Sequence, residues 1–90
     1  MTNPDDTGVE RRRDGELLSA EQAEAMAAGA EATGNHATAQ ALRLRAAEHT
    51  RRARAADEQL RTQQARRRAD LALTLRQRHA AATRDTGMSR

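Results

Sequence analysis

The chain has 90 residues, and it contains no Phe, Trp, Tyr, Cys, Ile or Lys. Its apolar residues are twenty-one Ala, eight Leu, three Met and one Val, and all of its fixed positive charge comes from sixteen Arg. The lack of Cys excludes disulfides, thiolate nucleophiles and thiolate metal sites, and so few large apolar side chains exclude an ordinary globular core.

The composition favours helices, because Ala, Leu, Arg, Gln and Glu have the highest helix propensities. We therefore expect an all-α fold, an elongated helical hairpin of coiled-coil type that needs association for part of its stability. The longest apolar runs are far shorter than the ~20 residues of a membrane-spanning helix. The first residues, MTNPDDTGVE, lack the apolar segment of a secretory signal. We expect a cytoplasmic protein without membrane contact.

Residues 1–15 are predicted to form a disordered tail, because they hold the only Pro, two of the five Gly and no periodic apolar pattern. Acidic residues flank the Arg triplet at positions 11–13, which is typical of a solvated segment. The helical hairpin is then expected to occupy residues 16–86, and residues 87–90 are predicted to be a disordered end.

A short acidic helix is predicted over about residues 19–33. Ser19 is a candidate N-cap, with Gln22 three residues later as in a capping box. Gly34 is suited to the position that follows a helix C-terminus. One face of this helix is predicted to carry Ala20, Ala23, Met26, Ala27 and Ala30.

A long basic helix is predicted over about residues 36–84, because no Gly or Pro occurs between Asn35, a candidate cap, and Thr86. The spacing of its apolar residues suggests an 11-residue repeat, which predicts a nearly straight or slightly right-handed pairing. A break near residues 62–64 would instead give three helices. On a helical wheel a sector of about 60° contains Leu42, Leu60, Leu71 and Leu75.

The charge changes sign at the turn between the two predicted helices. Residues 1–34 carry three Arg and eight acids, a net charge of −5, whereas residues 35–90 carry thirteen Arg and five acids, a net charge of +8. Opposite charges and small Ala faces favour antiparallel docking of the first helix on the second, around Leu42 and Ala46.

The four Leu of the wheel sector are the predicted partner interface. The fifteen residues of the first helix span only ~22 Å. This helix is therefore expected to reach back along the second helix to about Arg51. Leu60, Leu71 and Leu75 would then contact another chain, be covered through a bend in the second helix, or remain exposed. We expect contact with another chain, in a homo-oligomer or a complex with a partner protein.

Catalysis has almost no support in this sequence. The three His are far apart and none has the i,i+4 spacing of a helical metal site; His49, beside the Leu sector, is expected to be a partly buried, hydrogen-bonded side chain. The Ser residues lack a neighbouring base, and the Gly residues are scattered singly. We predict no enzyme activity, metal, cofactor or small-molecule ligand.

The sequence thus predicts a small non-catalytic interaction or assembly protein that uses a Leu/Ala stripe. The alternative is a DNA- or RNA-binding accessory protein that contacts phosphates through its Arg-rich helix. Against this alternative, the Arg residues spread around the helix, and some are expected to pair at i,i+4, as Glu48 with Arg52 and Arg66 with Asp70. The candidate phosphate contacts are Arg51, Arg52, Arg54, Arg66, Arg67, Arg68, Arg76 and Arg78.

Overall fold

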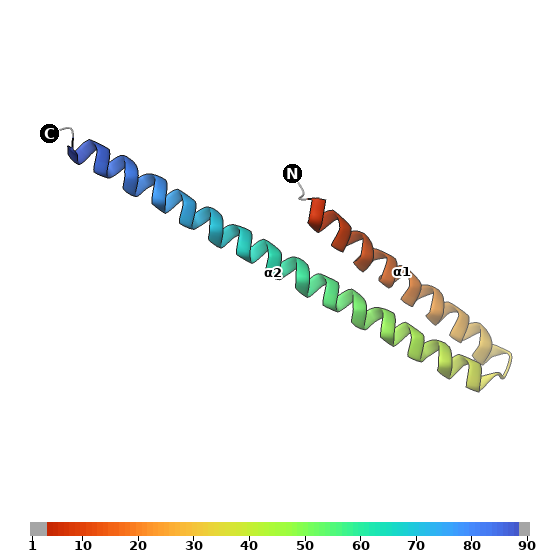
Figure 1. Cartoon of the computed structure of the whole chain (residues 1–90). Helices are drawn as coiled ribbons and strands as arrows, with labels where there is room; N and C mark the ends of the chain where they lie inside the picture. Colours follow the sequence, from red (N-terminus) through yellow and green to blue (C-terminus); the bar gives the residue numbers. More distant parts are fainter. Residues whose placement is uncertain (1–3, 89–90) are drawn as a thin grey trace. The chain divides into compact units, whose positions relative to one another are not determined.

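The computed structural model describes residues 4–88, with side chains described for residues 6–84. These residues form two helices and no strand: α1, Pro4–Ala32, and α2, His36–Met88. The chain divides into two units, Met1–Leu60 and Arg61–Arg90. In the first unit, α1 and the beginning of α2 lie side by side as a hairpin (Figure 1). The all-α hairpin predicted from composition is therefore confirmed.

The prediction of a disordered tail over residues 1–15 is wrong, because α1 begins at Pro4 and Ser19 lies in its interior. Pro is well suited to the first turn of a helix, where its missing N–H has no partner to lose. Val9, only 4% exposed, holds this segment in the hairpin. Residues 1–3 lie outside the described part.

The turn between the helices forms as the sequence predicts. Gly34 has a φ of +81°, and its N–H donates to the carbonyl of Glu31 at 3.0 Å. The Asn35 N–H donates to the carbonyl of Ala30 at 2.9 Å, which completes a Schellman motif. The Asn35 side chain then accepts from the N–H of Thr38 at 3.2 Å and caps α2.

The hairpin seam has a seven-residue period, not the predicted 11-residue one. Buried residues of α2 fall at 39, 46, 53 and 60, with a second buried or half-buried set at 42, 49 and 56. In α1 the two matching sets are 6, 13, 20, 27 and 9, 16, 23, 30. This period is typical of a left-handed coiled coil. The buried apolar residues are Val9, Ala20, Ala23, Ala27, Ala39, Leu42, Ala46, Ala53 and Leu60.

Docking of α1 on the start of α2 is confirmed, since Leu42 is 8% and Ala46 is 2% exposed. Met26, placed on the docking face from sequence, is instead 61% exposed. In a seven-residue register Ala23 and Ala27 occupy the seam, and Met26 lies beside them toward solvent.

A polar layer interrupts the Ala seam. Glu16 and His49 occupy seam positions of the two helices, and their side chains form a 2.5 Å hydrogen bond while remaining only 27% and 28% exposed. The partly buried, hydrogen-bonded His expected at position 49 is therefore confirmed. Nearby, Arg13 donates to Asp57 at 3.1 Å. This bond, together with a second to Asp14, raises the pKa of Arg13.

The second unit is helical through Met88, so Gly87 and Met88 belong to α2 rather than to a disordered end. Ser89 and Arg90 lie outside the described residues. The backbone stays helical across residues 62–64, and the alternative of a third helix is therefore wrong.

Substitution of two glycines tests whether residues 4–15 form a stable part of α1. Gly15 has open space around it and an ordinary helical backbone, so Gly15→Ala should raise the free energy of unfolding by about 0.5–1 kcal/mol. Gly34→Ala, the matched control, should lower it by ~1–2 kcal/mol because Gly34 is left-handed. Both are measured by thermal unfolding followed by circular dichroism. No change in Gly15→Ala would mean that residues 4–15 are not a stable part of α1.

Candidate partner interface

The four predicted interface residues separate into two environments. Leu42 and Leu60 are 8% and 4% exposed, inside the first unit, whereas Leu71 and Leu75 are 60% and 54% exposed in the second. The expectation that the first helix could not reach Leu60 is wrong. That estimate assumed fifteen residues, but α1 has 29 residues and a length of about 44 Å.

Three exposed residues of the second unit share one helix face, and we call them the C-terminal stripe: Leu71, Leu75 and Ala82. Arg68 and Arg78, also exposed, flank this face. Leu73 is 54% exposed on nearly the opposite side of α2. Three Leu within five positions therefore remain more than half exposed, and none of them contributes to a core within their own unit.

The first three candidate phosphate contacts lie on the hairpin. Arg51 contacts Glu48 at 2.5 Å, and Arg52 contacts Glu48 at 3.6 Å and Glu16 at 4.0 Å. The predicted i,i+4 pair of Glu48 and Arg52 is thus confirmed. Arg54 is exposed and lines an open groove with Arg13, Leu17, Thr50, Ala53 and Asp57.

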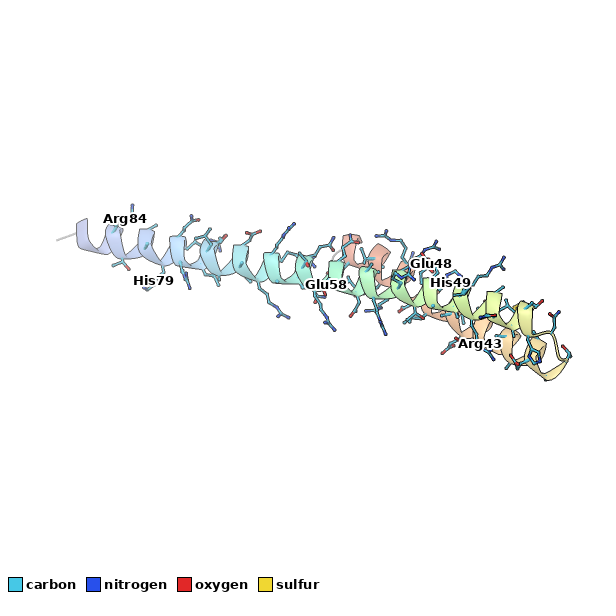
Figure 2. The ribbon with its side chains drawn as sticks, turned by 90° about the horizontal axis from the view of Figure 1, so that it is seen from below. Arg43, Glu48, His49, Glu58, His79 and Arg84 are labelled. Carbon is cyan, nitrogen blue, oxygen red and sulfur yellow. The ribbon has the colours of Figure 1, made fainter. Side chains whose placement is uncertain are left out.

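The remaining candidates lie in the second unit. Arg66, Arg68, Arg76 and Arg78 are exposed, Arg67 is half-buried, and within the described residues no ion pair joins Arg66 to Asp70 as predicted. Side chains of this part of α2 project on several sides, as His79 and Arg84 do in Figure 2. The structure therefore brings the cations into one segment but not onto one face.

The polar contacts across the hairpin were missed by sequence reasoning. Glu31 contacts the side chains of His36 and Arg43, the latter at 3.0 Å, and so joins the two helices at the turn end of the hairpin. Farther from the turn, Glu16 contacts His49 and Arg13 contacts Asp57, so polar contacts join the two helices there as well. The available signal was the seven-residue spacing of Arg13 to Ala20 and of Glu16 to Ala23, which a search for apolar residues alone passes over.

The described residues also bear on metal sites and membrane-spanning segments. No group of three or more His, Asp or Glu is placed to hold a metal ion there. Neither helix has, over the part described, a stretch long and apolar enough to cross a bilayer. No family model, curated protein or solved structure matches this chain.

Because Leu42 is buried and Leu71 is exposed, replacing each by Asp is predicted to have very different effects on the stability of the hairpin. Leu42→Asp should unfold the hairpin at room temperature or lower its melting temperature sharply, because an unpaired carboxylate would be buried. Leu71→Asp replaces an exposed side chain. In dilute protein the free energy of unfolding of the hairpin should therefore change by no more than about 0.5 kcal/mol. The measurement is thermal unfolding followed by circular dichroism. Equal losses in both variants would contradict the assigned burial.

Proposed function

We propose that this protein is a small non-catalytic interaction or assembly protein that binds its partner through the C-terminal stripe. The observation that carries the proposal is the exposure of Leu71 and Leu75 on a helical segment whose own unit has no second helix among the residues that the structure describes. The first unit uses Leu42 and Leu60 for its own folding, which leaves the second unit as the surface for a partner.

The energetics support this proposal. An isolated helix is marginal in water, because tertiary packing of an apolar face supplies most helical stability. Single exposed Leu residues are common on protein surfaces, but here no larger apolar side chain of residues 61–84 is buried at all. Burying one Leu side chain contributes ~1.5–3 kcal/mol. A partner that covers Leu71 and Leu75 would therefore stabilise the segment as it binds.

The test is site-specific photo-cross-linking in the cells that make the protein. Gln64 is exposed and on the same face as the stripe, so a photoreactive side chain there should give discrete adducts that Leu71→Asp abolishes. The same group at Ala41, exposed on the hairpin, serves as the matched control and should give none of these adducts. Adducts that are the same from both positions, or that survive Leu71→Asp, would contradict the proposal.

Nucleic-acid binding is a second candidate function. It is favoured by the exposure of Arg66, Arg68, Arg76 and Arg78, for which the described residues provide no ion pair, whereas Arg51 and Arg52 are paired with Glu48. The chain has no aromatic side chain for base stacking. Contacts would therefore be mainly to phosphates and nearly independent of base sequence.

This second function predicts a steep dependence on salt. If the segment binds duplex DNA, the logarithm of the binding constant should fall with the logarithm of salt concentration by about 0.9 for each phosphate neutralised. Replacing Arg66, Arg67 and Arg68 by Gln should weaken binding to every duplex alike and flatten this slope, with little loss of helix propensity. Fluorescence anisotropy with two unrelated duplexes measures both. No binding at low salt would exclude this function.

A further inference from the structure

One flank of α1 carries acidic and apolar side chains that are largely exposed. Leu17 and Leu18 are 44% and 55% exposed there, and Glu21 and Glu24, both exposed, follow within two turns. Glu16 and Glu31 point to α2 and contact His49 and His36, respectively. Glu21 and Glu24 have no ion-pair partner among the described residues, and residues 19–33 contain no Arg. We call Leu17, Leu18, Glu21 and Glu24 the α1 flank.

The C-terminal stripe has the complementary character. Residues 61–84 carry seven Arg and one Asp, a net charge of +6, whereas residues 4–32 carry eight acids and three Arg, a net charge of −5. Arg68 and Arg78 flank Leu71 and Leu75 and are exposed without an ion pair among the described residues. The exposed Leu of the stripe thus lie beside Arg, and those of the α1 flank lie beside Glu, with Arg13 and Arg54 also bordering Leu17.

We infer that the partner of the C-terminal stripe is a second copy of this chain, bound through its α1 flank. The inference rests on the proposed function and names its partner. A contact between two C-terminal stripes would instead bring the Arg residues of both copies together, and like charges at an interface are costly. Joining stripe to flank covers Leu71 and Leu75 with Leu17 and Leu18 while pairing Arg with Glu. The two surfaces differ, so a pair of copies makes this contact either once, head to tail, or twice about a two-fold axis.

Charge reversal on each surface separates this contact from the alternatives. Variant A is Glu21→Arg with Glu24→Arg, and variant B is Arg68→Glu with Arg78→Glu. Arg45→Glu, exposed on the hairpin outside both surfaces, is the control for a charge reversal elsewhere on the chain. Sedimentation velocity of the purified full chain at low salt, over a hundredfold range of concentration, measures association, and circular dichroism checks that each variant keeps its helices.

The wild type and Arg45→Glu should associate in a concentration-dependent way. Variants A and B should each associate roughly tenfold or more weakly, because several exposed charge pairs become repulsive at low salt. An equimolar mixture of A and B should associate again, since the basic stripe of A then meets the acidic flank of B, and the acidic stripe of B meets the basic flank of A. Combining all four substitutions in one chain should also restore association.

Three results would overturn the inference. A wild type that stays monomeric at every concentration excludes a second copy, and an adduct from Gln64 to a different protein would then keep the proposed function while replacing its partner. Association of variant A equal to that of the wild type would mean that the α1 flank is not used. Mixtures of A and B that remain as weak as either variant alone would mean that the two surfaces do not meet.

Discussion

The packing of Ala against Ala is the interaction on which the hairpin depends. Six of the nine buried apolar residues are Ala, and the larger ones are only Val9, Leu42 and Leu60. Small side chains let two helix backbones approach closely, but each contributes little burial. Stability must therefore accumulate over many layers, and α1 provides them over a length of 29 residues. An Ala seam is also nearly uniform along its length, so it determines poorly which residues of the two helices face each other.

Register is instead specified by the polar contacts. Glu16 with His49 in the seam, and Arg13 with Asp57 beside it, join residues that are roughly equidistant from Gly34. A shift of one helix along the other would separate these groups and leave half-buried charged atoms without partners, which is costly. A polar residue at a seam position is a known means of specifying register in coiled coils. The contacts near residue 16 thus complement the turn, which fixes the other end.

The sequence was sufficient for the fold class, the turn and the docking site, because each depends on local signals. Gly34 and Asn35 are the residues that a Schellman turn and a following cap require. The start of α1 was not predictable from apolar spacing, since its seam positions there are Asp6, Arg13 and Glu16, with Val9 alone apolar. For the same reason Leu60 was expected, like Leu71 and Leu75, to lie beyond the reach of the first helix, whereas it is buried in the hairpin. The length of the covering helix decided which Leu residues were left over.

The cation that contacts Asp14 and Asp57 is an Arg and not a Lys, and this choice affects how the contacts of the protein can be regulated. A guanidinium keeps its proton throughout the range of cellular pH, and every cationic side chain of the chain apart from His is an Arg. The chain has no Lys, so acetylation, which removes positive charge in many helical proteins, has no side chain to act on. The positive charge that Arg places on both helices therefore persists throughout the range of cellular pH. Reversible changes of charge are left to other groups, such as the hydroxyl groups of Ser and Thr, which phosphorylation makes negative.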